Sequence, residues 1–219
     1  MSRFVFCRTG PVMKSADDNY KTPQKCKARQ FVIDAVLRSG VEVKSILTLP
    51  GREALCVKEF QKHWPRPETT YVGIEGHSTR LKSSVISHLL DSHLGITFSE
   101  MTMKKSALIR GPDRQPSRSM APVRTLVPAS ATGKANYGPF DFSYLDFCGY
   151  CSQNTVDDVR RFLPMVREGG VIGLTFSLGK THANEIVAKL SVLPVVIDGY
   201  YEYRTSSDMM VVVIRKPVI

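Results

Sequence analysis

The sequence predicts an α/β fold, a Rossmann-like doubly wound sheet of seven strands between two layers of helices (α/β/α). Three observations predict it. Short apolar runs with strand character alternate with segments of helical apolar spacing. One run, YVGIEG at 71–76, ends on a carboxylate and a glycine, and the run before it is broken by Pro50 and Gly51. The last two strands follow each other without a helix, so we expect a mostly parallel sheet with an antiparallel C-terminal strand.

The predicted elements begin after an N-terminal arm. Residues 1–21 show no periodicity, so the domain is predicted over 22–219. Thr22 and Pro23 provide an N-cap and a proline at the first helical position, and Ser39-Gly40 stops the helical apolar spacing that follows. The sequence therefore predicts a helix between these two signals.

The next elements form a strand–helix–strand unit of the kind that grips a nucleoside. A strand at 43–49 ends at Pro50-Gly51, a helix follows over about 54–65, and a second strand at 70–75 ends on Glu75. In such a unit the turn brings backbone N–H groups to the ligand, and the carboxylate accepts hydrogen bonds from the ribose hydroxyls. Glu75 is therefore the central candidate residue. The alternative is a solvated carboxylate at a strand end.

A long basic loop is predicted in the middle of the domain. A helix capped by Ser78 and a third strand at 95–101 precede it, and residues 102–139 then show several prolines and serines but no long apolar period. A loop this long is usually functional or mobile, and cations beside a nucleoside site could hold the phosphates of a nucleic acid. The alternative is a solvated insertion. The candidate nucleic-acid-binding residues are Lys104, Lys105, Arg110, Arg114, Arg118 and Arg124.

The second half of the chain completes the sheet. A fourth strand is predicted at 140–147, and Asp146 lies near its end. Asn154 is expected to cap the following helix, whose inner stripe is Val156, Val159, Phe162, Leu163 and Val166. A turn at 167–170 leads to the remaining strands and helix, which are predicted at 171–176, 181–190, 195–197 and 209–214, with a turn at 206–208.

Size and composition indicate a single water-soluble domain. The chain has 219 residues, 42% of them hydrophobic, which suits one core. No stretch approaches the roughly 18 apolar residues of a membrane span, and the first residues lack the apolar core of a signal peptide. We therefore expect a soluble intracellular protein, cytoplasmic or within the organelle of its synthesis, with no membrane partner.

The net charge of +10 predicts attraction to polyanions, of which nucleic acid is the commonest. The same charge can also serve solubility alone, and that alternative stays open.

Three segments together resemble the class I S-adenosylmethionine-dependent methyltransferases. They are the acidic end of the second strand, GIEG at 73–76, the ending of the fourth strand, YLDFCG at 144–149, and the turn before the fifth strand, REGGVI at 167–172. The resemblance covers nearly the whole chain from Thr22 onward, and it includes the closing order of one helix and then two strands.

This resemblance implies S-adenosylmethionine as the cofactor. It places Glu75 at the ribose, the turn after the first strand at the amino-acid portion, and the residues after the third strand at the adenine. The cofactor-binding residues implied are Leu49, Pro50, Gly51, Glu75, Gly76, His77, Glu100, Met101, Asp146 and Phe147.

The catalytic residues implied are Asp146 and Tyr150. Methyl transfer is an in-line displacement, so the enzyme aligns the nucleophile and, where needed, accepts a proton. Asp146 could orient or deprotonate the acceptor, and His77 and Cys148 are further candidates.

The first motif departs from the family pattern, which usually has an acidic residue followed by several glycines. This chain has TLPGREA at 48–54, with a single glycine. A side chain in place of a second glycine can obstruct close approach of the backbone to a ligand. The alternative function is therefore a non-catalytic methyltransferase-like subunit of a larger nucleic-acid-associated protein assembly.

The acceptor is indicated by charge and not by a motif. The ending of the fourth strand lacks the sequences of enzymes that methylate base amines or the C5 atom of cytosine. The hypothesis is thus a methyltransferase whose acceptor is a nucleic acid or a nucleotide.

Two other motifs point to other chemistry. Cys148 and Cys151 form a C-x-x-C after a strand, so a thiol oxidoreductase is a further alternative. Five sparse cysteines otherwise predict reduced thiols, and no set of ligands has zinc spacing, so no metal is expected. The triplet GKT at 179–181 lacks the upstream glycine of a phosphate-binding P-loop.

Overall fold

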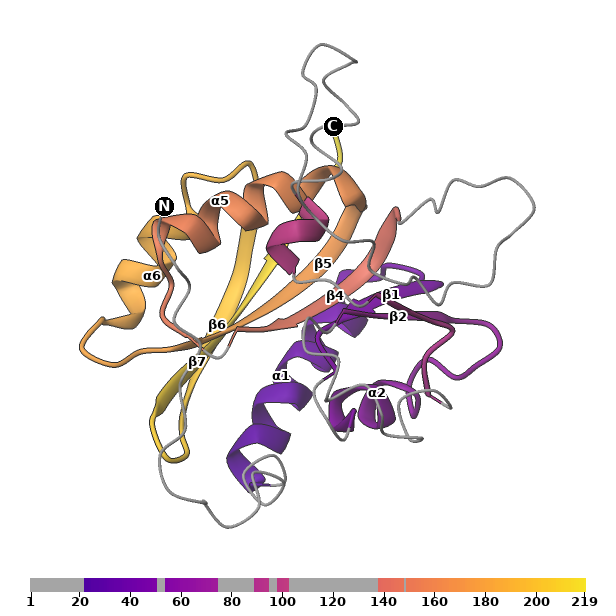
Figure 1. The fold of residues 1–219 in the computed structure, drawn as a ribbon, viewed down its shortest axis with the longest axis horizontal. Coiled ribbons are helices and arrows are strands. Elements are labelled where there is room, and N and C mark those ends of the chain that lie inside the picture. The colour runs from indigo at the N-terminus through magenta and orange to yellow at the C-terminus, as the bar shows by residue number, and fades with distance from the viewer. Residues whose placement is uncertain (1–21, 51–53, 75–88, 95–97, 103–137, 148) are drawn as a thin grey trace, which may run out of the picture.

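The protein is described here by a computed structural model, which covers residues 22–50, 54–74, 89–94, 98–102, 138–147 and 149–219 (Figure 1). Its centre is a seven-stranded sheet in the order β3-β2-β1-β4-β5-β7-β6. Strands β1 to β5 pair in parallel, and β7 lies antiparallel between β5 and β6. The predicted sheet is confirmed. Its strands are β1 (Ser45–Thr48), β2 (Thr70–Ile74), β3 (Ser92–Leu94), β4 (Phe140–Asp146), β5 (Val166–Ser177), β6 (Val196–Arg204) and β7 (Asp208–Arg215).

Helices cover both faces of the sheet, which confirms the three-layer architecture (Figure 1). Helices α1 (Pro23–Ser39) and α2 (Leu55–Phe60) pack on one face, and α5 (Gln153–Phe162) and α6 (Ala183–Leu190) pack on the other. Each face has its own apolar cluster, because buried strands present apolar side chains to both layers.

Helix α1 begins and ends where the sequence predicts. The Thr22 hydroxyl accepts a hydrogen bond from the Lys25 backbone N–H at 3.4 Å, and Pro23 occupies the first turn. Gly40 ends the helix in the left-handed region at φ 69°, where glycine is favoured.

The third strand lies earlier than predicted. The expected strand at 95–101 is wrong, because β3 is Ser92–Leu94 and residues 98–102 are helical. Phe98 and Met101 are both buried and three residues apart, so they share one face of a helical turn. The predicted strand contains only three apolar residues, Ile96, Phe98 and Met101, which are too few for their spacing to distinguish a helix from a strand.

Helix α5 has a different cap from the predicted one. The Ser152 hydroxyl, and not the Asn154 side chain, accepts from the Thr155 backbone N–H at 3.2 Å. Val156, Val159 and Phe162 are fully buried as predicted. Leu163 lies in the short 3-10 helix η2 (Leu163–Met165), and Val166 begins β5.

Two strands are longer than predicted. Strand β5 includes the predicted turn at 167–170, which bulges between the Phe140–Val166 and Phe142–Val171 pairs. Gly170 has no room for a Cβ atom, which would lie 2.8 Å from the Arg167 carbonyl oxygen. Strand β6 extends to Arg204, so the β6–β7 hairpin projects well beyond the predicted 195–197.

Several predicted segments lie outside the described residues. They are the arm at 1–21, most of the helix after Ser78, and all but the two ends of the basic loop at 102–139. Within the described part of the chain, no helix has the length and apolar character needed to cross a membrane.

Candidate active site at the carboxyl edge of the sheet

The loops after three parallel strands meet at the carboxyl edge of the sheet. The Leu49 backbone N–H, just after β1, donates to the Tyr144 carbonyl of β4 at 3.2 Å. The Ser177 N–H, at the end of β5, donates to the Gly149 carbonyl in the loop after β4 at 3.0 Å. Ligands of open α/β sheets bind at this edge, where strand order reverses around β1 and β4.

Asp146 is the charged group at the end of β4, where it was predicted. It is partly buried, and burial raises the pKa of its carboxyl above the usual range. The positive charges of Lys25 and Arg29 on α1 oppose this rise. A carboxyl group whose pKa is raised by burial and lowered by two nearby cations can orient a polar acceptor or take a proton.

The turn after β1 packs against the start of α2. Thr48 and Cys56 lie 3.4 Å apart from Oγ1 to Sγ, and the Cys56 thiol points to the Pro50 carbonyl oxygen at 4.0 Å. Burial raises the pKa of Cys56 to about 11, so this thiol stays protonated and serves as a packed hydrogen-bonding group. Pro50 is buried and Leu49 partly buried against the core.

Ala54 takes the conformation that a glycine would be expected to supply. Its φ is 48°, in the left-handed region, and its side chain is fully buried at the start of α2. A left-handed conformation costs a residue other than glycine about 1 kcal/mol, so Ala54 is strained at the start of α2.

Tyr144 and Thr175 extend the buried polar group to β5. The Thr175 hydroxyl donates to the Tyr144 phenol oxygen at 3.3 Å, and both residues are buried. Burial, with the Asp146 charge second, raises the pKa of Tyr144 well above the ordinary value. The phenol is therefore neutral at physiological pH and cannot act as a base.

Aromatic rings form the other side of the edge. Phe147 stacks on Phe176 with a centroid distance of 5.8 Å and meets Phe98 edge to face at 5.5 Å. Phe98 belongs to the helical turn after β3, as do Glu100, which is exposed, and Met101, which is buried in the core. The structure thus brings Phe147 and the predicted adenine-binding segment together.

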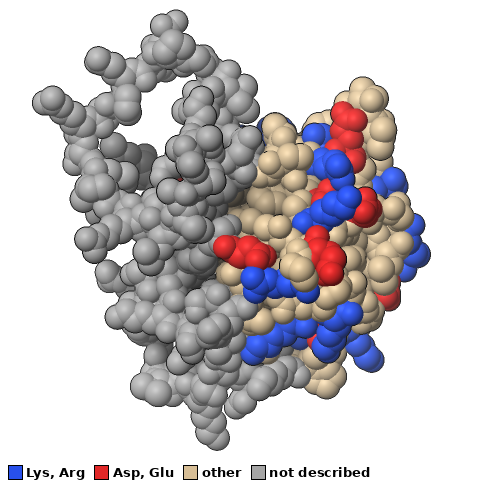
Figure 2. Space-filling view, turned by 90° about the vertical axis from the view of Figure 1, so that its right-hand side faces the viewer, with Lys and Arg blue, Asp and Glu red and all other residues tan. Residues whose placement is uncertain are grey.

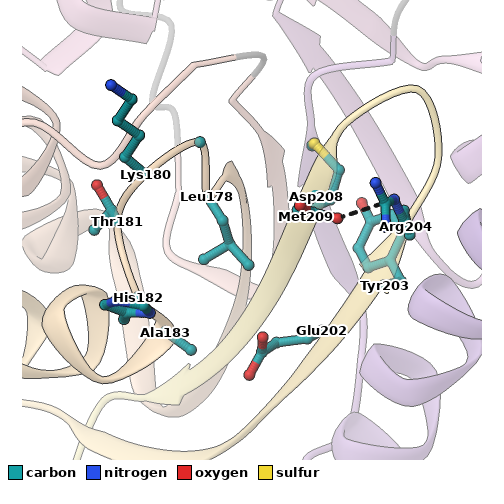
Figure 3. A pocket seen from close by; sticks show the side chains of 11 residues that line it. Leu178, Lys180, Thr181, His182, Ala183, Glu202, Tyr203, Arg204, Asp208 and Met209 are labelled. Atoms are coloured by element: carbon teal, nitrogen blue, oxygen red, sulfur yellow. Dashed lines mark ion pairs between the residues drawn. The ribbon is translucent and has the colours of Figure 1, made fainter.

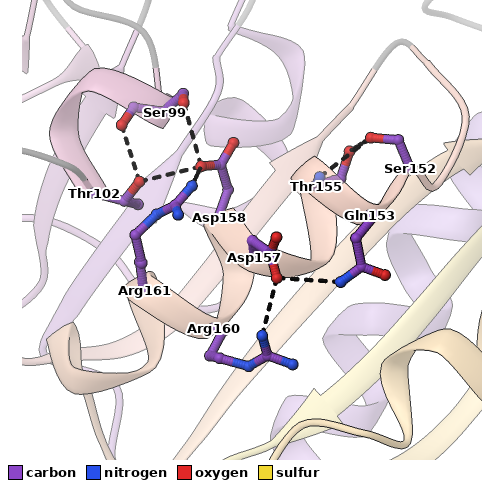
Figure 4. Close-up of polar contacts among 9 residues, drawn as sticks. All are labelled: Ser99, Thr102, Ser152, Gln153, Thr155, Asp157, Asp158, Arg160 and Arg161. Atoms are coloured by element: carbon purple, nitrogen blue, oxygen red, sulfur yellow. Dashed lines mark hydrogen bonds and ion pairs between the residues drawn. The ribbon is translucent and has the colours of Figure 1, made fainter.

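Asp158 of α5 ties that helical turn to the body of the protein (Figure 4). Its carboxylate, 6% exposed as a residue, accepts from the Ser99 hydroxyl at 3.2 Å and the Thr102 hydroxyl at 3.4 Å and pairs with Arg161. Among the described residues, the polar partners of the neighbouring Asp157 are Gln153 and Arg160 on its own helix. Of these two carboxylates, Asp158 is therefore the one that contacts the segment after β3.

Tyr150 lies beyond the edge and reaches the loop after β5. Its ring is 63% exposed and lies so close to Gly179 that a Cβ atom there would be 2.2 Å from Cε1. Gly179 also has φ 55°, so glycine is required for both reasons. Gly179 borders a hollow of about 530 Å³ between the α6 loop and the β6–β7 hairpin (Figure 3).

Part of the predicted site cannot be placed. Gly51, Glu75, Gly76 and His77 lie outside the described residues, as do Cys148 and the six cations named for the basic loop. Cys151 is buried, and burial raises the pKa of its thiol, which does not favour a reactive thiolate. Among the described residues, no group of three or more His, Cys, Asp or Glu side chains could hold a metal ion.

Sequence reasoning missed the two cations beside Asp146. Arg29 is buried at 7% exposure although it is charged, and it falls at the spacing of the apolar stripe of α1 with Val32, Ile33 and Val36. The one sequence signal that could have identified Arg29 as a site residue is a charged side chain at a position where the helical spacing predicts the core. Its partner could not be named, because Asp146 lies far along the chain.

Comparison with solved structures identifies the fold. NodS, an N-methyltransferase from Bradyrhizobium japonicum WM9 in complex with S-adenosyl-L-homocysteine, matches over 90% of this chain and 90% of its own, with a TM-score of 0.53 and 11% identity. A putative sarcosine dimethylglycine methyltransferase from Galdieria sulphuraria matches over 88% and 86%, with a TM-score of 0.53 and 6% identity. The 4+2 cyclase SpnF matches over 91% and 84%, with a TM-score of 0.52 and 10% identity.

The chain therefore has the class I S-adenosylmethionine-dependent methyltransferase fold. Sequence identities this low establish a shared fold but not a shared activity. The name of one match, a cyclase, describes a reaction other than methyl transfer. No protein family model and no curated protein matches the chain.

Proposed function

We propose that this protein is an S-adenosylmethionine-dependent methyltransferase whose acceptor is a nucleic acid or a nucleotide. The observation that carries the proposal is Asp146, a partly buried carboxylate at the end of β4 on the carboxyl edge of a methyltransferase fold. A desolvated charge is costly, and such groups are retained where chemistry uses them.

The residues of the edge suit the proposed cofactor. Phe147, which is partly exposed and meets the buried Phe98 edge to face, offers an apolar surface for an adenine ring. S-adenosylmethionine would supply a methyl group on a positively charged sulfur, a charge that the Asp146 carboxylate complements. Asp146 would also orient the acceptor and hold its proton.

The distribution of charge supports a polyanionic acceptor. The described residues carry 16 Lys and Arg against 15 Asp and Glu, a net charge of +1, whereas the whole chain carries +10. In Figure 2 the basic side chains of the described surface lie next to acidic ones. The excess therefore belongs to the other segments, above all to 103–137, which hold seven basic residues and one acidic residue.

The second candidate function is a non-catalytic subunit of a nucleic-acid-associated assembly. Buried Pro50 favours it, because a proline just after β1 offers a ligand no backbone N–H at that position. Under this alternative the protein has the same fold and binds nucleic acid through the same charge, but it binds no cofactor.

Titration calorimetry with S-adenosylmethionine separates the two functions. We expect binding in the micromolar range that is lost in Glu75→Ala, since a ribose contact would disappear. Glu68→Ala is the matched control, because Glu68 is exposed at the opposite end of β2. A wild-type protein that shows no binding contradicts the enzyme and leaves the subunit.

A further inference from the structure

An open hollow lies beside Gly179, the residue on which the Tyr150 ring rests. At about 530 Å³ it falls within the range of small-molecule pockets, and its walls come from two separate elements (Figure 3). Leu178, Ala183 and Met209 give it a mostly buried apolar floor. Lys180 and His182 line it on the loop before α6, and Glu202, Arg204 and Asp208 line it on the hairpin.

The hollow lies on the same edge as Asp146. Strand β5 ends at this edge, and β6 runs parallel to β5 because both are antiparallel to β7. The loop after β4, which carries Tyr150, is bonded to the end of β5 through Gly149 and rests on Gly179. An acceptor in the hollow would thus lie next to the loop that follows β4, on the α6 side of the sheet, whereas the Asp146 side chain lies on the α1 side.

The charges that line the hollow sum to zero. Two cations, Lys180 and Arg204, stand against Glu202 and Asp208, and Arg204 pairs with Asp208 at 3.4 Å. Lys180 points away from the centre in Figure 3, whereas the Glu202 carboxylate points toward Ala183 and His182. A phosphate is therefore disfavoured inside, where it would meet Glu202, and is favoured at the rim beside Lys180.

Glu202 is an exposed residue of β6 whose carboxylate lines the hollow. Within the described part of the chain, no hydrogen bond or ion pair holds its carboxylate, so both oxygens can accept hydrogen bonds from a ligand. Two adjacent N–H donors match a carboxylate, as in the bidentate pairs that arginine makes. Among the common bases, only guanine offers two adjacent donors on one edge, its ring N–H and its amino group.

We propose that this hollow is the acceptor site and that it holds a guanine base, with Glu202 accepting from its N–H edge and the phosphate lying at the rim near Lys180. The inference rests on the proposed methyltransferase function and names the acceptor unit for it. Leu178, Ala183 and Met209 line the floor of the hollow and provide an apolar surface against which a planar base can pack.

Binding of the four 5′-mononucleotides to the full chain, followed by calorimetry or ligand-observed NMR, tests the proposal without the methyl donor. We expect GMP to bind at least about tenfold more tightly than AMP, CMP or UMP, because guanine alone can donate two adjacent hydrogen bonds to the Glu202 carboxylate. Glu202→Gln should abolish this preference. Glu185→Gln on α6 should keep it, since Glu185 is exposed and does not line the hollow.

Saturating S-adenosylmethionine should leave GMP binding in place if the two sites are distinct. The proposal is overturned by equal binding of all four nucleotides, by no binding at about 10 mM, by a preference that survives in Glu202→Gln, or by displacement of GMP by S-adenosylmethionine. If the wild-type protein binds GMP with the expected preference but does not bind S-adenosylmethionine, the methyltransferase function is rejected and the guanine site is retained. Equal thermal unfolding of wild type and both variants ensures that the comparison is between folded proteins.

Discussion

At the scale of single residues, Asp146 is a candidate functional group whose ionisation opposes the stability of the fold. Burial raises its pKa, and the Lys25 and Arg29 charges only partly offset that effect. The unfolded chain, where the carboxyl is solvated, releases its proton at a lower pH than the folded chain. The ionised carboxylate therefore costs folding free energy.

We predict that Asp146→Asn stabilises the protein at neutral pH. The folded pKa is raised, so between the unfolded pKa of about 3.9 and the folded value the native state binds more protons, and wild-type stability falls as pH rises through this window. Asp146→Asn cannot ionise at this position, so its stability does not fall in this way as pH rises. Urea unfolding at about pH 4 and about pH 7.5 should show the two proteins diverging toward higher pH, and under the proposed function the variant should lose methyl transfer.

Asp34→Asn on the solvent side of α1 provides the comparison. Asp34 accepts a hydrogen bond from Gln30 at 2.7 Å within the helix, away from the edge of the sheet. A wild type that gains stability relative to Asp146→Asn as pH rises would show that Lys25 and Arg29 outweigh burial, the reverse of the present account.

At the scale of elements, the segment after β3 depends on one buried carboxylate. Residues 98–102 form little more than one helical turn, which is too short to be stable alone. Asp158 bonds both hydroxyls of this turn, and Phe98 packs on Phe147 and Phe162. The turn is thus held by contacts from α5 and β4.

We predict that Asp158→Asn lowers the free energy of unfolding by about 1–3 kcal/mol, because a buried acceptor loses its charge and its ion pair. The adjacent Asp157→Asn removes a more exposed pair within α5 and should cost no more than about 0.5 kcal/mol. Urea unfolding gives both values. Hydrogen exchange should show faster opening of 98–102 in Asp158→Asn alone, and equal effects of the two substitutions would contradict the assigned role.

The elements that the sequence predicts well are those with signals at both ends. Helix α1 has Thr22, Pro23 and Gly40, and β4 has aromatic residues at alternate positions, Phe140, Phe142 and Tyr144. The turn at 98–102 and the outer half of β6 were missed because tertiary contacts decide them. Tyr201 of β6, for example, stacks on Phe31 of α1 at 5.9 Å, a contact that no local pattern reveals.

The candidate site was predictable to the same degree. Asp146 follows from the order of strands, but the hollow does not, because Glu202 and Lys180 come from elements whose ends the sequence leaves open. Cations on α1 reach Asp146 only through the packing of α1 on the sheet. The order of strands in the sequence thus predicts groups at strand ends, but it does not predict groups that other elements bring together through tertiary packing.

At the scale of the whole molecule, charge and fold are separated along the chain. The described fold is nearly neutral, and 103–137 alone carry seven basic side chains against one acidic side chain. A nearly neutral body gives little attraction to a polyanion, so nucleic-acid affinity should depend on the basic segment.

We predict that nucleic-acid binding falls steeply with salt and that the slope depends on this segment. Each phosphate contact contributes about 0.7 to 0.9 to the slope of log affinity against log salt, so neutralising Arg110, Arg114, Arg118 and Arg124 should flatten it by about 3. Neutralising four exposed cations of the described fold, Lys27, Arg38, Lys58 and Lys62, removes the same charge and should change the slope by less than about 1. Fluorescence anisotropy with a labelled oligonucleotide at several salt concentrations measures both. Equal flattening by the two sets would mean that net charge alone attracts the polyanion, and affinity independent of salt would remove the basic segment from the binding site.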